Sequence, residues 1–336
     1  ILDTYFDEEE EEEPEPVITK ATIELAMIGD ILLHTELAVY EDFSSSFSAM
    51  EPYLQSYDYL IANQESLPVG NKFNISGYPQ FASPEYIIRD LQEAGVDMLN
   101  MANNHAVDKG EEGLRTAFEN IEGYNIPYVG AYQNAEDRAK HRIVEVDGIK
   151  IGFVSYTYET NGLYLPKSSP LSVNYIDIKQ MMADVEEIKP LVDVTVAIVH
   201  WGYEYVTEEN ENQRYIATML NQAGVDIIFG GHPHVLQPYS KMVNAAGQET
   251  HIFYSLGNFF ARTITSKSSM IGGIGSFEIT KEAEKVTISN PKLIASSLLK
   301  DPDGVYRIYP LAEVEERSVQ NMDWVKKILG EDVDVQ

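Results

Sequence analysis

Five short apolar runs in this chain each end on a cluster of residues that can bind metal ions. Such runs, rich in β-branched residues, predict buried strands. In open α/β sheets, ligands bind beyond the carboxyl ends of the strands. The sequence therefore predicts an α/β fold with one site built from distant segments, holding one or two divalent ions. The five clusters are Gly29-Asp30, Asn63-Gln64-Glu65, Asn103-Asn104-His105, His200 and Gly231-His232-Pro233-His234.

The composition excludes several classes of site and partner. The 336 residues are 44% hydrophobic, which is enough for a large core, and the formal net charge is −30. Nucleic acids and anionic lipids both need basic surface, so we expect no nucleic-acid partner. No apolar run approaches the roughly 18–20 residues that span a bilayer, so we expect no direct membrane insertion within this chain. Cysteine is absent, which excludes disulfides, thiolate metal ligands and cysteine nucleophiles.

The first 17 residues are expected to form a disordered acidic tether. The acidic run at 7–13 repels itself and is followed by Pro14-Glu15-Pro16, a combination typical of extended segments. The chain opens on Ile1 and not on methionine, which suggests that a signal or anchor precedes it. We therefore expect an extracytoplasmic domain tethered to the cell membrane.

Local patterns predict the elements that surround these clusters. Ser83-Pro84-Glu85 carries helix-start signals, so we expect a helix over 83–94 that ends at Gly95. Asp147-Gly148 predicts a tight hairpin turn between two strands. Helical alternation fades after residue 250, where antiparallel strands are expected, so the sheets should be mixed.

The residue types suggest roles within the predicted site. His232 and His234 lie in a glycine- and proline-containing turn and can face adjacent metal ions. His105 is placed to act as an acid or to stabilise charge, and Asp108 could orient it. Glu204 is a candidate general base, or a residue that supports the metal ligands without contacting the ion. From the residues alone, Asp30 could equally be a metal ligand or a turn residue. Glu65 could equally be a metal ligand or an exposed acidic residue of a loop.

The ordered set of clusters, followed by Ser255-Leu256-Gly257-Asn258-Phe259, resembles the CapA capsule-synthesis family. That family is associated with poly-γ-glutamate biosynthesis and belongs to the calcineurin-like metallophosphoesterase superfamily. The resemblance spans roughly residues 21–262. It implies a four-layer α/β/β/α sandwich over residues 18–290 with a two-metal site at the strand ends. Residues 291–336 are expected to form an extension packed on the same domain.

The resemblance also implies site residues and two departures. It implies that His105 protonates or stabilises the leaving group. The superfamily usually begins with Asp-x-His, whereas this chain has Asp30-Ile31-Leu32, and Glu65 replaces the usual bridging aspartate. One of the two metal positions is therefore expected to be weaker or vacant unless His34 compensates. The implied metal ligands are Asp30, Glu65, Asn104, His200, His232 and His234.

These observations lead to one functional expectation and two alternatives. We expect a metal-dependent, phosphoesterase-like hydrolase of extracellular capsule or poly-γ-glutamate biosynthesis that uses a metal-activated water. Oxygen and imidazole ligands suit Mn, Fe, Zn or Mg. The expected partners are an anionic polymer or phosphoryl substrate and membrane capsule-synthesis proteins. A non-catalytic scaffold or export component, and a metal-dependent γ-glutamyl peptidase, remain open alternatives.

Overall fold

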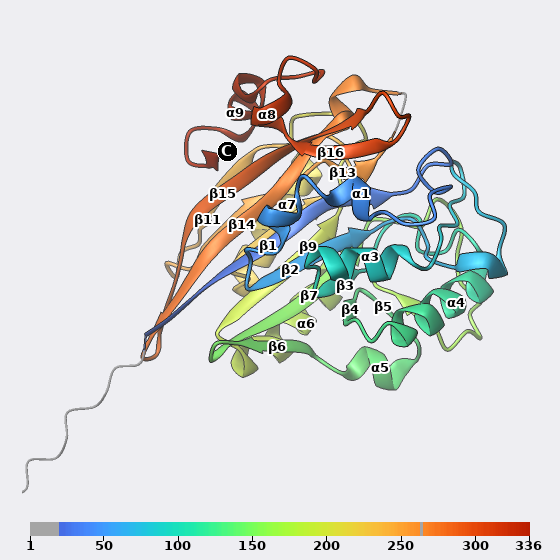
Figure 1. Cartoon of the computed structure of the whole chain (residues 1–336). Helices are drawn as coiled ribbons and strands as arrows, with labels where there is room; N and C mark the ends of the chain where they lie inside the picture. The colour runs from blue at the N-terminus through green and yellow to red at the C-terminus, as the bar shows by residue number, and fades with distance from the viewer. Residues whose placement is uncertain (1–19, 263–264) are drawn as a thin grey trace, which may run out of the picture.

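The structure is a computed structural model that describes residues 20–262 and 265–336. The tether expected over residues 1–17 lies outside the described residues. The first strand, β1 (Lys20–Leu32), runs through the centre of the molecule beside the two long strands β14 (Ile271–Glu282) and β15 (Lys285–Lys300), as Figure 1 shows.

The larger sheet has nine strands and is mixed, as predicted. β1 pairs in parallel with β2 and β13, and it pairs antiparallel with β14. β15 crosses residue 290, the predicted boundary between the main domain and its extension, and the later strands β16 and β17 return to it. The remaining strands of this sheet are β2 (Tyr59–Gln64), β3 (Met98–Asn100), β4 (Tyr128–Val129), β13 (Asn258–Ala261), β16 (Tyr306–Pro310) and β17 (Asp334–Val335).

The second sheet has six strands in the order β11-β12-β10-β9-β7-β6. Its central strands are parallel, while β6 and β11 pair antiparallel at the two edges. A further two-stranded sheet joins β5 (Ala131–Tyr132) to β8 (Ser172–Val173). The six strands are β6 (Arg142–Val146), β7 (Ile149–Thr157), β9 (Val194–His200), β10 (Ile227–Gly231), β11 (Tyr239–Val243) and β12 (Glu249–Phe253).

Helices cover the outer faces of both sheets, which makes a four-layer α/β/β/α sandwich. The helices are α1 (Ser44–Phe47), α2 (Glu51–Leu54), α3 (Ile87–Ala94), α4 (Gly110–Gly123), α5 (Ala135–Ala139), α6 (Ile178–Ile188), α7 (Glu211–Ala223), α8 (Leu311–Val314) and α9 (Met322–Leu329). The alternation of side chains along β1 builds two of the apolar layers. Ala26 and Ile28 pack toward α1, α3 and α4, whereas Leu25 and Met27 pack against the second sheet. A third apolar layer joins α6 and α7 to the outer face of β9 and β10.

Two local predictions have different outcomes. The hairpin at Asp147-Gly148 is confirmed, with φ angles of +49° and +78° between β6 and β7. The helix start at Ser83 is wrong, because α3 begins at Ile87. The Ser83 hydroxyl instead donates a hydrogen bond to the carbonyl of Leu67 at 3.1 Å, and its backbone bridges Pro68. These contacts between distant segments override the local capping signal.

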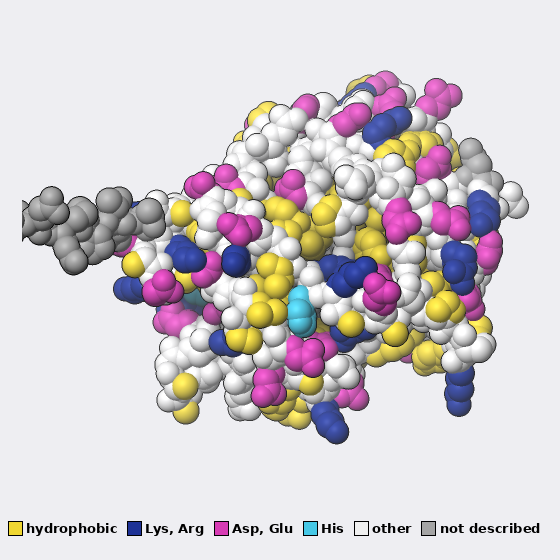
Figure 2. Space-filling view, turned by 90° about the horizontal axis from the view of Figure 1, so that it is seen from below, with side chains coloured by type: hydrophobic (Ala, Val, Ile, Leu, Met, Phe, Trp, Pro, Cys, Tyr) yellow, Lys and Arg dark blue, Asp and Glu magenta, His cyan; other side chains and the backbone are white. Residues whose placement is uncertain are grey.

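Charged side chains of both signs are mixed on the surface that Figure 2 shows. On the face in Figure 2, lysine and arginine side chains lie among acidic ones and form no continuous basic surface. Within residues 20–262 and 265–336, no helix is long and apolar enough to cross a membrane.

Candidate metal centre

The predicted clusters meet at the carboxyl ends of strands from both sheets. In the first sheet, Asp30 of β1 lies in register with Asn63 of β2, and Asn63 lies in register with Asn100 of β3. In the second sheet, His200 at the end of β9 lies in register with Gly231 at the end of β10. The two sheets face each other here, so ligand side chains approach one space from both sides.

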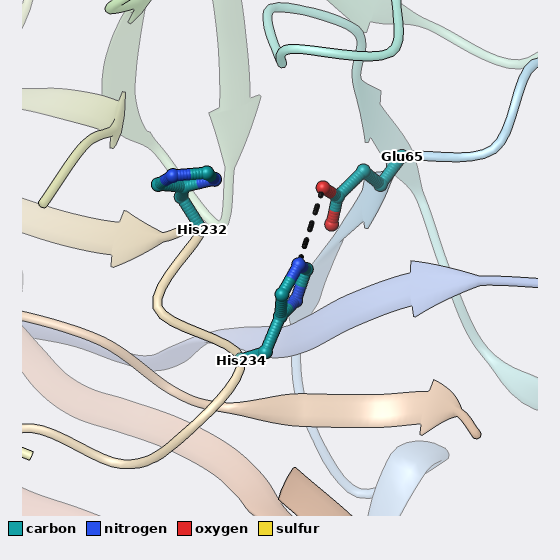
Figure 3. A group of neighbouring side chains, drawn as sticks. All are labelled: Glu65, His232 and His234. Carbon is teal, nitrogen blue, oxygen red and sulfur yellow. Dashed lines mark ion pairs between the residues drawn. The ribbon is translucent and has the colours of Figure 1, made fainter. Parts of the chain in front are cut away.

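Glu65 lies at the middle of this space. It follows β2 directly and is fully buried. Figure 3 shows His232 and His234, which both come from the turn after β10, with the ring of His234 pointing toward the carboxylate of Glu65. Glu65 Oε1 lies 3.8 Å from His234 Nε2 and 3.4 Å from His200 Nε2. Two groups of donor atoms, each lying within 4.8 Å of one another, share this carboxylate: Glu65 with His232 and His234, and Glu65 with Asp30 and His200.

The buried charges shift one another's protonation. Burial alone would raise the pKa of Glu65, but His234 and His200 hold that pKa well below its usual range. Burial alone would lower the pKa of His234, but the carboxylates of Glu65 and Asp30 raise it to about 9. Burial holds the pKa of His232 well below its usual value, so this imidazole is neutral. Glu65 therefore stays ionised, and the protein supplies a neutral imidazole next to it.

The turn that carries the two histidines is strained and clamped. His232 and His234 have φ angles of +95° and +57°, in the left-handed region that residues other than glycine rarely occupy. Backbone hydrogen bonds hold the turn at both ends: Trp201 N–H donates to Gly231 at 3.1 Å, and Tyr205 N–H donates to Pro233 at 2.7 Å. Strained residues of this kind concentrate at functional sites, where the surrounding structure determines their conformation.

The segment after β3 supplies the predicted acid and its orienting partner. His105 Nδ1 lies 2.7 Å from Asp108 Oδ2, and that same oxygen accepts the backbone N–H of Phe81 at 2.6 Å. Asn104 Oδ1 accepts a hydrogen bond from His200 Nε2 at 2.8 Å. The imidazole of His105 is thus fixed through Nδ1, and Nε2 is the ring atom left to exchange a proton.

Two adjoining cavities open at this site. One of about 480 Å³ is lined by residues that include Asn104, His105 and Asp108. The other, of about 510 Å³, is lined by residues that include His34. Glu204 is exposed and lines both cavities, so it lies at the entrance, outside the clustered donor atoms.

His34 lies beside the cluster and does not join the grouped donor atoms found among the described residues. Its Nδ1 lies 3.2 Å from the carbonyl oxygen of Leu32, and its ring packs edge-on against Phe81. Burial lowers the pKa of His34 to about 4, so it is a neutral side chain of the cavity wall.

The donor set fits a divalent cation. Both oxygens of Glu65 and Nδ1 of His232 are buried without a hydrogen-bond partner among the described residues. An ionised carboxylate that is buried without donors is strongly disfavoured unless a cation compensates it. Glu65, His200, His232 and His234 present oxygen and imidazole ligands, which suit Zn, Mn, Fe or Mg rather than a soft metal.

The residues that the sequence analysis missed are mostly polar side chains behind the ligands. Asn100 and Ser155 interrupt apolar strands, and that interruption is a signal that could have identified them. Asn161 comes from a loop without such a signal, yet its Nδ2 lies 3.4 Å from His105 Nδ1. Asn258, noted as part of the final motif, has its Oδ1 2.9 Å from His234 Nδ1. The ring of Tyr158 lies 4.5 Å from that of His232.

Strain at His232 should be measurable by comparing His232→Gly with His232→Ala. Both variants remove the imidazole, but only glycine relieves the φ of +95°. Without metal, we expect the glycine variant to be more stable than the alanine variant by about 1 kcal/mol, the reverse of the usual order. Urea unfolding with a chelator present measures the difference. Equal stability, or a more stable alanine variant, would contradict the strain.

Metal affinity should fall with decreasing pH. The pKa of His234 is about 9, so this imidazole is protonated at neutral pH and must lose a proton to bind a metal ion. Below pH 9 we expect the affinity for Zn²⁺ to fall by up to about tenfold per pH unit. Chelator-buffered titrations between pH 6 and 8 test this, with His234→Ala as the variant in which the dependence weakens. A flat profile for the unaltered protein would contradict the raised pKa.

Comparisons with solved structures agree with this fold. Solved structures with the same fold include a 5'-nucleotidase precursor from Thermus thermophilus, with a TM-score of 0.51 and 15% identity, covering 82% of this chain. A putative 5'-nucleotidase from Staphylococcus aureus matches with a TM-score of 0.52 and 14% identity over 86% of this chain. This chain covers 54% of each of those proteins, and at such low identity the likeness establishes the fold alone.

Sequence relatives identify the family. The PGA biosynthesis protein CapA of Bacillus subtilis (strain 168) is 29% identical over 310 residues, covering 84% of this chain and 79% of that protein. The capsule biosynthesis protein CapA of Bacillus anthracis is 29% identical over 303 residues, covering 84% of this chain and 72% of that protein. The profile described as "Bacterial capsule synthesis protein PGA_cap" matches residues 24–263. The chain therefore belongs to the bacterial capsule synthesis protein family PGA_cap, on a metallophosphoesterase-like fold.

Proposed function

We propose that this chain is a metal-dependent, phosphoesterase-like hydrolase that acts in the synthesis of an extracellular capsule or of poly-γ-glutamate. The single observation that carries the proposal is the buried Glu65 carboxylate, which faces three imidazoles and has no hydrogen-bond donor among the described residues. When bound there, a divalent ion supplies a nucleophilic water at neutral pH and neutralises an anionic substrate.

His105 is the proposed proton donor to the leaving group. Asp108 Oδ2 accepts the hydrogen bond from His105 Nδ1 and orients the ring, so Nε2 is the atom that would deliver the proton. The ring is almost fully buried at the wall of the 480 Å³ cavity, which limits competition from solvent. Asn104 and Asn161 lie beside it and can donate hydrogen bonds to substrate oxygens.

The proposed substrate is an anionic polymer or a phosphoryl compound. A chain with a net charge of −30 repels such a substrate over most of its surface, so a bound cation gives the favourable contact. The curated relatives are named for capsule and PGA biosynthesis, which supports a place beside membrane capsule-synthesis proteins. We also propose that the domain lies outside the cytoplasm, where an N-terminal tether holds it at the cell membrane.

Turnover of model esters tests the proposal. With Mn²⁺, we expect the chain to cleave bis-p-nitrophenyl phosphate or p-nitrophenyl phosphate. His105→Ala should lower kcat by about 10²- to 10⁴-fold because the leaving group loses its acid, while bound metal stays unchanged. Asp108→Asn should lower kcat less and alter its pH profile. His141→Ala, at an exposed histidine of another cavity, is the matched control and should leave turnover unchanged.

The same assay separates the alternatives. Cleavage of γ-glutamyl p-nitroanilide without cleavage of either phosphoester would favour the peptidase and overturn the phosphoesterase. Stoichiometric bound metal without turnover of any of the three compounds would favour the non-catalytic scaffold or export component.

A further inference from the structure

A row of polar side chains crosses the larger sheet beneath the metal centre. Asp30 of β1 is paired in register with Asn258 of β13 on one side and with Asn63 of β2 on the other. Asn63 is paired in turn with Asn100 of β3. All four side chains are buried. A row of buried polar groups within apolar strands must satisfy its own hydrogen bonds, which fixes the direction of each amide.

The hydrogen bonds of this row run in one direction toward Asp30. Ser155 Oγ donates to Asn100 Oδ1 at 2.5 Å, Asn100 Nδ2 donates to Asn63 Oδ1 at 2.8 Å, and Asn63 Nδ2 donates to Asp30 Oδ1 at 2.7 Å. A carboxylate can only accept, so Asn63 must present its NH₂ group to Asp30. The same nitrogen lies 3.4 Å from His200 Nδ1.

The NH₂ group of Asn63 thus occupies the space between Asp30 and His200. The backbone of Gly231 closes one side of this space: a Cβ atom there would lie 2.8 Å from Asp30 Oδ1 and 3.4 Å from both Asn63 Nδ2 and His200 Nδ1. An amide nitrogen is a hydrogen-bond donor and does not bind cations. Two residues after Asp30, Leu32 is buried in an apolar contact with Phe81, so no imidazole is available from that position.

The second oxygen of Asp30 is also engaged. Asp30 Oδ2 lies 3.1 Å from His234 Nδ1 and accepts the backbone N–H of His232 at 3.3 Å. This contact orients His234 so that Nε2 is the ring atom facing Glu65. Carboxylates that accept the distal N–H of a metal-binding histidine commonly set its tautomer and orientation.

We propose that the chain binds one divalent ion, held by Glu65, His232 and His234, and that the Asn63 amide takes the place of a second cation between Asp30 and His200. Asp30 is then a positioning residue that orients His234, in contrast to the ligand role expected from the family resemblance. The inference rests on the metal binding in the proposed function, but it does not require turnover.

Metal content and a gain-of-site variant test the inference. Elemental analysis of the full chain, loaded with Zn²⁺ or Mn²⁺ and freed of excess ion, should give one ion per chain. Asn63→Asp replaces the NH₂ group with a carboxylate oxygen between Asp30 and His200, and this variant should bind two ions. Asn210→Asp adds the same charge at the N-cap of α7 and should still bind one. Two ions in the unaltered protein would overturn the proposal.

The metal affinity and the Co²⁺ absorption spectrum of an Asp30 variant test the role of this residue. Asp30→Asn should keep one ion with an affinity lower by about 10- to 100-fold, as expected for an orienting partner. Glu65→Gln should lose the ion altogether. The Co²⁺-loaded Asp30→Asn variant should retain the number and kind of ligands seen in the absorption spectrum of the unaltered protein. Loss of bound metal in Asp30→Asn, in a variant whose circular dichroism shows a folded chain, would make Asp30 a ligand and overturn its positioning role.

Failure of this inference is distinguishable from failure of the proposed function. One bound ion without hydrolysis of any ester would support the single-ion centre and overturn the hydrolase. Hydrolysis with two bound ions would support the hydrolase and overturn the single-ion centre. No bound ion under any loading condition would overturn both.

Discussion

The buried negative charge of Glu65 is the constraint that organises the whole site. A carboxylate without hydrogen-bond donors, placed between two sheets, must be compensated by nearby positive charge. The raised pKa of His234 shows the protein supplying that charge as a proton. A divalent ion held by Glu65, His232 and His234 would supply it in place of the proton. The proton and the proposed metal ion would compete for one place, which would link metal binding to pH and to the stability of the turn at 231–234.

The position of this charge follows from the way the two sheets face each other. β1 and β2 bring carboxylate and amide groups to one side, and the ends of β9 and β10 bring imidazoles to the other. Neither sheet alone supplies a complete set of donors. Backbone hydrogen bonds from Trp201 and Tyr205 hold the turn in which His232 and His234 adopt left-handed conformations. The large apolar layers on either side stabilise the strands. This stability allows the strained turn at His232 and His234, and the nearby carboxylates of Asp30 and Glu65, to persist.

The two halves of the centre are chemically unequal. Around His232 and His234, buried atoms lack partners, and they suit a cation. Around Asp30, every carboxylate oxygen already accepts a hydrogen bond. The sequence establishes that the chain belongs to the PGA_cap family, and its fold is shared with solved 5'-nucleotidase structures. The inequality bears on the proposed mechanism, because a single ion would leave His105 and the neighbouring amides to stabilise charge on the leaving group.

The order of residues along the chain was enough to predict the buried strands that carry the site and the polar residues that end them, because buried strands and ligand clusters both leave local patterns. It also contained the ordered motifs that assign the family. Which of these residues meet, how Ser83 is used, and which atoms of Asp30 and Asn63 are already engaged became clear only from the folded chain. The direction of the Asn63 amide depends on a partner 33 residues away, and the register of its strand depends on pairing with β1. Such pairing has no local signature, since it is set by hydrogen bonds that exist only once the sheets have formed.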